Sequence, residues 1–326
     1  MSGESVESAQ DGGPRATSWA EVVRLRTLPA AVAPVILGAG AAAAMGNLSV
    51  VRVLLAAGVA LALQVGCNLA NDYSDGVRGT DDERSGPPRL TASGQVAPGT
   101  VKLAAFGCFG LGALLGLALV VLSGHWWLLI IGAAAIAAAW FYTGGPRPYG
   151  YAGLGEVFVF VFFGLVATVG TTYVQAGTVP GWLWPSACGI GLLACSLLMV
   201  NNLRDIDTDP RHGKMTLAVR LGEQRARRAF FAMLYLPLLL GAVGLLWARD
   251  AGSASPADGG GRVSPLLSLL ISVGVPLLLL PLVRRATAPV RAGARGRDLI
   301  GSLRDAGLLE LAYGIAFAAA TVIITL

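Results

Sequence analysis

Long apolar runs recur along this chain and constrain its fold more than any other feature. Each run holds roughly 18 to 22 residues with almost no charge, the length that a helix needs to cross a hydrocarbon core of ~30 Å. Of the 326 residues, 55% are hydrophobic and 13% are charged, whereas soluble domains carry about 25% charged residues. The sequence therefore predicts an all-α, multi-pass membrane protein with about nine spans, at 28–46, 50–70, 101–122, 126–143, 153–175, 182–203, 229–247, 264–283 and 305–325.

The positive charges lie almost entirely on one side of these spans. If the N-terminus is cytoplasmic, the inner segments hold 21 of the 24 Lys and Arg residues, and the outer segments hold Arg52, Arg249 and Arg262. Cytoplasmic loops carry such an excess in membrane proteins. We therefore expect a protein of the cell membrane with its N-terminus inside. The net charge of +5 is accounted for by the Lys and Arg residues of the cytoplasmic loops. We therefore expect no nucleic acid partner.

The first 18 residues differ in composition from the rest of the chain. Residues 1–18 are acidic, contain Gly and Ser, and are poor in large apolar residues. Such a composition is typical of a disordered tail. We expect a tail at 1–18 followed by a single transmembrane domain at 19–326.

Two Asp-rich segments fall on the predicted cytoplasmic side, NLANDYSDGVRGTDDE from Asn68 and NNLRDIDTD from Asn201. In the first, Asn68, Asp72 and Asp75 are spaced i, i+4 and i+7, which places them on one face of a helix. In the second, the spacing i, i+3 and i+7 predicts the same for another set of three side chains, Asn202, Asp205 and Asp209. Each segment is thus expected to present amide and carboxylate oxygens together.

So many carboxylates at a membrane boundary are unfavourable unless a cation neutralises them. Oxygen ligands without His or Cys favour a hard ion, and Mg²⁺ bridging carboxylates to phosphate oxygens suits this set. Basic residues that could bind the remaining phosphate oxygens follow both segments. They are Arg78, Arg84 and Arg89 after the first, and Arg211 and Lys214 after the second.

On these residues the chain resembles the UbiA superfamily of intramembrane aromatic prenyltransferases, and the likeness covers nearly its whole length. Within the superfamily it is most similar to the branch that prenylates 1,4-dihydroxy-2-naphthoate in menaquinone synthesis. The stretches that carry this likeness are RLRTLPAAVAPV (24–35), NDYSDGVRGTDDER (71–84), YTGGPRPYGYAGLGE (142–156) and NNLRDIDTDPRHGKMTLAVRLGE (201–223). The resemblance implies a bundle of nine helices with a cytoplasmic active site and Mg²⁺ as cofactor.

The resemblance also assigns roles to single residues. Metal ligands are expected at Asp72, Asp75, Asp205 and Asp209, helped by Asn68 and Asn202. The usual position of a third carboxylate in the first segment holds Gly79, so Asp81, or its neighbour Asp82, is the candidate there. The stretch PRLTASG (88–94) makes Arg89 the foremost expected diphosphate contact, with Arg78, Arg211 and Lys214 beside it.

The implied reaction joins a polyprenyl diphosphate to the naphthoate ring, with loss of CO₂ and a proton, to give demethylmenaquinone. Tyr142, Arg147 and Glu156 are expected to contact the acceptor or the prenyl chain, and Glu156 could bind or deprotonate the acceptor. Other acceptors, such as 4-hydroxybenzoate or homogentisate, stay open, as does a cation-coupled transporter. Transport sites usually lie near the bilayer midplane, whereas the interiors of these spans carry almost no charge. The donor chain length and the oligomeric state are not predicted.

Overall fold

A computed structural model describes residue 24 and residues 27–79, 90–91, 94–253 and 263–325. Within these residues the protein is entirely helical, as the sequence predicts, and contains no strand. The expected tail at 1–18 lies outside them. The long helices are α2 (Leu28–Ala44), α3 (Val50–Val77), α4 (Pro98–Ser123), α5 (Leu128–Phe141), α7 (Ala167–Ala176), α8 (Leu183–Arg204), α10 (Glu223–Ser253), α11 (Pro265–Arg291) and α12 (Ile300–Thr325).

Short helical pieces complete the chain. The 3₁₀ turn η2 (Tyr149–Ala152) lies in the connection after α5, and η4 (Asp209–His212) follows α8. Three further pieces are α6 (Gly155–Val159), α9 (Leu217–Leu221) and η5 (Gly296–Leu299). A π-helical stretch, η3 (Phe160–Val166), joins α6 to α7 in one continuous rod.

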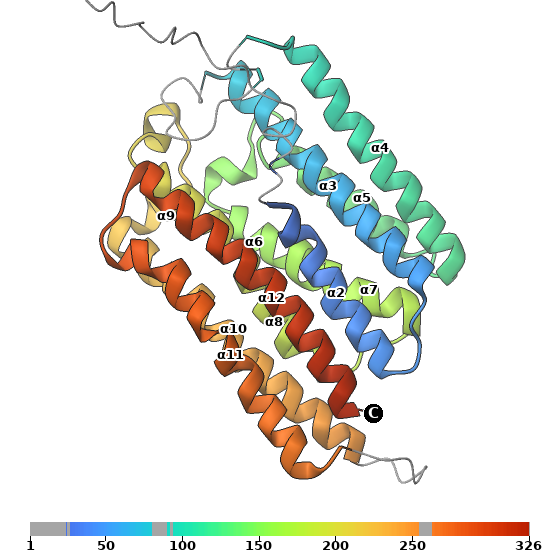
Figure 1. The fold of residues 1–326 in the computed structure, drawn as a ribbon. Helices are drawn as coiled ribbons and strands as arrows, with labels where there is room; N and C mark the ends of the chain where they lie inside the picture. The colour runs from blue at the N-terminus through green and yellow to red at the C-terminus, as the bar shows by residue number, and fades with distance from the viewer. Residues whose placement is uncertain (1–23, 25–26, 80–89, 92–93, 254–262, 326) are drawn as a thin grey trace, which may run out of the picture.

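Within the described residues, seven helical segments are long and apolar enough to cross a membrane. Two further apolar helices, Leu28–Ala44 and Leu128–Phe141, fall on predicted spans but are shorter. Figure 1 shows the long helices side by side, with α4 at one edge of the bundle and α10 and α11 at the other. The chain is an integral membrane protein, and its helices match the predicted apolar runs closely.

The two Asp-rich segments have different backbones. Helix α3 continues seven residues past the predicted run and ends at Val77, so the first segment is helical through Asp75, as expected. Helix α8 instead ends at Arg204, and Asp205 is its C-terminal cap. The prediction of a continuous helical face through Asp209 is therefore wrong. Pro210 has no N–H to donate to a carbonyl one turn earlier, so a continuous α-helix through this segment would lose a hydrogen bond there. The chain instead forms a turn and then η4.

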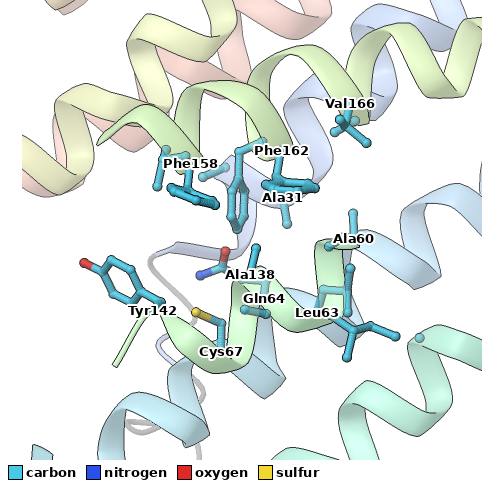
Figure 2. Close-up of a pocket in the computed structure, with 18 of the residues that line it drawn as sticks. Ala31, Ala60, Leu63, Gln64, Cys67, Ala138, Tyr142, Phe158, Phe162 and Val166 are labelled. Carbon is cyan, nitrogen blue, oxygen red and sulfur yellow. The ribbon is translucent and has the colours of Figure 1, made fainter. Parts of the chain in front are cut away.

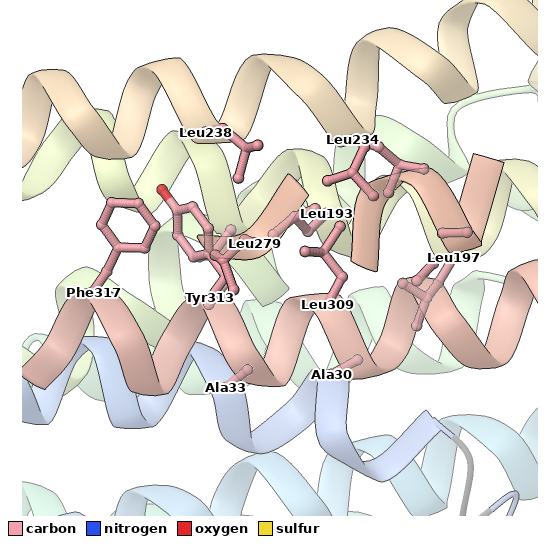
Figure 3. Packing of buried hydrophobic residues seen from close by; sticks show 14 of the residues in the cluster. Ala30, Ala33, Leu193, Leu197, Leu234, Leu238, Leu279, Leu309, Tyr313 and Phe317 are labelled. Atoms are coloured by element: carbon pink, nitrogen blue, oxygen red, sulfur yellow. The ribbon is translucent and has the colours of Figure 1, made fainter. Parts of the chain in front are cut away.

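A dense apolar core occupies the half of the bundle formed by α8, α10, α11 and α12, with α2 packed against it. Figure 3 shows Leu193 and Leu197 of α8 between α10 and α12, and the fully buried ring of Tyr313 next to that of Phe317. Small residues let α2 and α12 approach closely: a Cβ added to Gly314 would lie 2.6 Å from the Ala33 carbonyl oxygen. Membrane helices associate through such small residues because van der Waals packing replaces the hydrophobic effect in lipid.

Candidate active site

A cavity of about 800 Å³ lies between α2, α3, α4, α5, the α6–α7 rod and α8. Along α3 its wall runs from Ala56 to Asp75, which at about 1.5 Å per residue corresponds to about 28 Å. One end of the wall is polar and contains Arg24, Asn68, Asn71, Asp72, Asp75, Asn201, Asn202, Arg204 and Lys214. The rest is made mainly of Ala, Gly, Val, Leu and Phe residues. The cavity thus combines a charged end with a long apolar interior.

The first Asp-rich segment forms the centre of the polar end. Asn68, Asp72 and Asp75 all belong to the cavity wall, which confirms that their helical spacing brings them to one face. Asp72 is only 1% exposed. Its Oδ2 accepts a hydrogen bond from the backbone N–H of Leu90 at 3.1 Å, and its Oδ1 accepts one from Thr91 at 3.0 Å. The chain after the first segment therefore folds back onto Asp72.

Amide side chains on α3 are held by two neighbouring elements. Asn68 donates from Nδ2 to Thr27 Oγ1 at 3.3 Å, and Gln64 donates to the same hydroxyl at 3.1 Å. Asn71 accepts a hydrogen bond on Oδ1 from Thr143 Oγ1 at 2.7 Å. These contacts fix the polar end of α3 against the start of α2 and against the connection after α5.

Tyr151 joins the two segments across the polar end. Its hydroxyl donates to Asp75 Oδ1 at 2.6 Å. Its ring lies 5.3 Å from the Arg78 guanidinium carbon and 5.4 Å from Lys214 Nζ, distances at which cations are attracted to aromatic rings. Lys214 Nζ is itself 3.7 Å from Asp75 Oδ2, and the Met215 N–H donates to the Tyr151 carbonyl at 3.0 Å.

The second segment lies at the end of α8 and is arranged differently. Asp205 accepts two hydrogen bonds from its neighbour Arg204, at 2.9 Å from Nε and 2.6 Å from Nη2, and both side chains are buried. Asp209 is also buried, and its backbone N–H donates to the Asp205 carbonyl at 2.9 Å. Asn202 and Arg204 belong to the cavity wall, whereas Asp205 and Asp209 do not.

Glu156 lies in the first turn of α6 next to the second segment. It is 5% exposed, and its Oε1 accepts a hydrogen bond from Asn202 Nδ2 at 3.2 Å. Its Oε2 is buried and has no hydrogen-bond partner among the described residues. Glu156 is not part of the cavity wall but is adjacent to it through Asn202.

The donor atoms at the polar end suit a hard cation. Asn68, Asp72 and Asp75 offer amide and carboxylate oxygens, the ligands that Mg²⁺ prefers. Within the described part of the chain, no group of three or more His, Cys, Asp and Glu residues is close enough to hold a metal ion. The first segment offers a divalent cation two carboxylates and an amide by residue type. Its candidate third carboxylate, Asp81, lies outside the described residues together with Asp82, Arg84 and Arg89.

The other predicted phosphate contacts are distributed unevenly. Lys214 is in the cavity wall, as a diphosphate contact requires. Arg78 is not, because its guanidinium donates to the carbonyl oxygens of Thr143 and Gly145. Arg147 and Arg211 are exposed and lie outside the wall.

Aromatic rings form one side of the cavity where its polar and apolar parts meet. Tyr142 lies edge to face with Tyr149, with centroids 5.6 Å apart, and Tyr149 stacks on Phe158 at 4.0 Å. Phe158 in turn stacks on Phe162 at 6.3 Å. Figure 2 shows Phe158 and Phe162 facing Ala60, Leu63 and Gln64 of α3 across the cavity. Phe162 lies within the π-helical stretch η3, and π-helical turns often occur at functional sites.

Several residues of the polar end are not among the predicted site residues. Arg204 immediately precedes Asp205, and Tyr151 and Thr143 fall within the stretch YTGGPRPYGYAGLGE. The feature of the sequence that could have identified these three residues is their position next to or within the stretches that carry the family resemblance. A hydrogen bond across 76 residues, such as the one from the Tyr151 hydroxyl to Asp75, has no local pattern in a sequence.

Comparisons with known proteins agree with this architecture. The pattern of the UbiA prenyltransferase family matches residues 31–281. A protein of Mycobacterium tuberculosis named 1,4-dihydroxy-2-naphthoate octaprenyltransferase is 47% identical over 307 residues, which cover 93% of this chain and 96% of that protein. The Escherichia coli protein of the same name is 44% identical over 221 residues, which cover 66% of this chain and 71% of that one.

A solved structure has the same fold. The UbiA homolog from Archaeoglobus fulgidus bound to DMAPP and Mg²⁺ aligns with a TM-score of 0.61 at 15% identity, over 93% of this chain and 99% of that one. The family resemblance seen in the motifs is thereby confirmed by a family pattern, by relatives and by the fold. This chain belongs to the UbiA prenyltransferase family.

Proposed function

We propose that this prenyltransferase transfers a polyprenyl group from polyprenyl diphosphate to 1,4-dihydroxy-2-naphthoate. The observation that carries the proposal is the cavity, whose polar, charged end and apolar interior match a donor with a charged head and a hydrocarbon tail. The names of the Mycobacterium tuberculosis and Escherichia coli relatives supply the acceptor. The product is demethylmenaquinone, in its quinol form, with loss of CO₂.

The diphosphate head is proposed to lie at the polar end of the cavity. Lys214 is positioned there to bind phosphate oxygens, and Arg89 and Arg211 are further candidates. The ligands proposed for Mg²⁺ are Asn68, Asp72, Asp75, Asp81, Asn202, Asp205 and Asp209. When bound, Mg²⁺ supplies Lewis-acid stabilisation of the diphosphate as the leaving group.

The aromatic wall is proposed to protect the reacting carbon. The C–O bond of the donor breaks with both electrons going to diphosphate, which leaves an allylic cation. Water would capture this cation, so the apolar wall contributes by excluding it. The faces of Tyr149, Phe158 and Phe162 stabilise positive charge, and Tyr142 lies where the polar and apolar parts meet.

The acceptor is proposed to enter beside Glu156 and Asn202. The ring carbon that bears the carboxylate attacks the cation, and the bond to that carboxylate then breaks, so its electrons restore the aromatic ring as CO₂ leaves. Glu156 can orient or deprotonate an acceptor hydroxyl through its second carboxylate oxygen, because only Oε1 is engaged by Asn202. Arg147 is exposed and lies in the connection after α5. It is the proposed contact for the acceptor carboxylate as the acceptor approaches the site.

The placement in the membrane is also a proposal. The count of 21 inner and 3 outer Lys and Arg residues supports a cytoplasmic N-terminus and a cytoplasmic polar end. With the helices Leu28–Ala44 and Leu128–Phe141 counted as spans, the domain crosses the cell membrane nine times.

The decisive experiment is an acceptor panel in isolated membranes that contain the protein. Labelled polyprenyl diphosphate is supplied with dihydroxynaphthoate, 4-hydroxybenzoate or homogentisate, with Mg²⁺ or with a chelator. We expect a prenylated naphthoquinol and released CO₂ only with dihydroxynaphthoate and Mg²⁺. Preference for another acceptor would refute the substrate, and cation flux without any prenylated product would favour the transporter.

A further inference from the structure

Arg204 of the second segment and Lys214, which follows it, each neutralise a carboxylate, one in each Asp-rich segment. The Arg204 guanidinium binds both oxygens of Asp205, at 2.9 and 2.6 Å, and Lys214 Nζ lies 3.7 Å from Asp75 Oδ2. The Arg204 and Asp205 side chains are 4% and 6% exposed, so solvent screens this pair very little. Removing one partner from such a buried pair leaves a charge that needs another counter-ion.

Arg204 stands between Asp205 and the cavity. It is part of the cavity wall, whereas Asp205 is not. A ligand that enters the polar end therefore meets the guanidinium before it can reach the Asp205 carboxylate. A metal ion that binds Asp205 competes with Arg204 for the same two carboxylate oxygens.

We propose that Arg204 is an exchangeable counter-ion and a further diphosphate-binding residue. It neutralises Asp205 while the site is free of substrate, and it moves to the phosphate oxygens when the metal ion takes its place on Asp205. The planar fork of a guanidinium fits phosphate as well as carboxylate, so the same two N–H groups serve both partners. This inference rests on the proposed function, in which Asp205 is a metal ligand.

The exchange makes metal and diphosphate binding depend on each other. The metal ion and the Arg204 guanidinium compete for the same Asp205 carboxylate. Diphosphate supplies another anion for the guanidinium, so each ligand raises the affinity for the other. Lys214 can act in the same way at Asp75, but a single ammonium at 3.7 Å holds its carboxylate less firmly than the two short bonds of Arg204.

Replacing Arg204 by Gln separates the two roles. The probe is Mn²⁺ binding to purified protein in lipid nanodiscs, measured by electron paramagnetic resonance without diphosphate, and donor KM is measured separately at saturating Mg²⁺. We expect Mn²⁺ to bind about fivefold more tightly or better, because its competitor is gone, while the KM for prenyl diphosphate rises about tenfold. Arg225→Gln, the same change at an exposed arginine, is expected to alter neither value.

Opposite shifts in the two values are the signature of exchange. If Arg204→Gln binds Mn²⁺ as weakly as the parent protein or more weakly, the exchange is refuted. Should this variant fail to fold, Arg204→Lys keeps the charge but not the fork, and it is expected to shift both values in the same opposite directions by a smaller factor. An Arg204→Lys variant without tighter Mn²⁺ binding also refutes the exchange.

Asp205→Asn distinguishes this failure from a failure of the proposed function. It is expected to weaken Mn²⁺ binding severalfold in both the parent and the Arg204→Gln background. If Asp205→Asn leaves Mn²⁺ binding unchanged in both, the metal role of Asp205 is wrong and the proposed function loses that ligand. If Asp205→Asn weakens Mn²⁺ binding but Arg204→Gln does not tighten it, only the exchange is wrong.

Discussion

The two Asp-rich segments share a composition but not a structure. The first lies on an unbroken helix, and its Asn68, Asp72 and Asp75 side chains are already in the cavity wall. The second begins where α8 ends, and its carboxylates lie behind Arg204. The comparison shows that two segments of similar composition can form two halves of a polar region with different structures, one on a helix in the cavity wall and one in a turn behind a buried arginine.

Both halves are anchored to the same connection, residues 142–156. Asn71 receives a hydrogen bond from Thr143, Asp75 receives one from Tyr151, and Asn202 donates one to Glu156. The connection after α5 thus sets the distance between two segments that are more than a hundred residues apart in sequence. Changes in it should affect both segments at once.

The largest effect is expected from Asp72→Asn in the first segment. The substitution removes a buried charge. It also places an amide N–H₂ against one of the two backbone N–H groups, of Leu90 and Thr91, that donate to the Asp72 carboxylate. We expect turnover to fall about a hundredfold or more, as when a stabilising group is removed from an active site. Prenylated product formed in membranes with equal amounts of protein is the measurement. The matched control is Asp207→Asn, which changes an exposed acid in the second segment. Equal losses of turnover in the two variants would contradict a special role for Asp72.

Glu156→Gln tests the side of the site that contacts the second segment. Gln can still accept from Asn202, but it cannot take a proton or hold an anionic contact. We expect an approximately tenfold rise in acceptor KM with an unchanged donor KM, which corresponds to roughly 1.4 kcal/mol. Glu310→Gln is the control, because Glu310 is a fully buried acid of α12 outside the cavity wall. Equal effects on donor and acceptor would argue for a structural role of Glu156.

Tyr151→Phe tests the tie between the halves. It removes the hydroxyl that donates to Asp75 but keeps the ring beside Arg78 and Lys214. A hydrogen bond to a charged group is worth about 1.5–3 kcal/mol, and we expect a loss of about fivefold in turnover, since solvent can replace part of it. Tyr151→Leu, which also removes the ring, should raise donor KM further. If the Phe and Leu variants are alike, the ring contributes nothing to the placement of the cations.

The smallest effect is expected from Pro210→Ala in the second segment. Without proline, α8 can compete with the turn that now separates Asp205 from Asp209. We expect a decrease in turnover of about threefold and a small rise in donor KM. The control is Pro180→Ala, in the connection just before α8 begins at Leu183, with steady-state kinetics as the readout. Higher turnover in Pro210→Ala would mean that a helical second segment works better than the turn.

The fold was predictable because its determinants are local. Membrane-length apolar runs and charge bias define the helices, and the i, i+4 and i+7 spacing of Asn68, Asp72 and Asp75 defines a face wherever the chain is helical. The same reasoning failed for Asp209, because periodicity says which face residues share but not where a helix stops. Pro210 was the local signal that a helix could not continue through this segment.

The sequence by itself determined the membrane class, the helices, the family and the oxygen-rich composition of the site. Only the tertiary structure decided that Tyr151 meets Asp75, that Lys214 faces the first segment, and that Arg204 covers Asp205. The physical reason is that helix formation and membrane insertion depend on neighbours along the chain. The pairing of buried charges depends instead on which helix ends the packed bundle brings together.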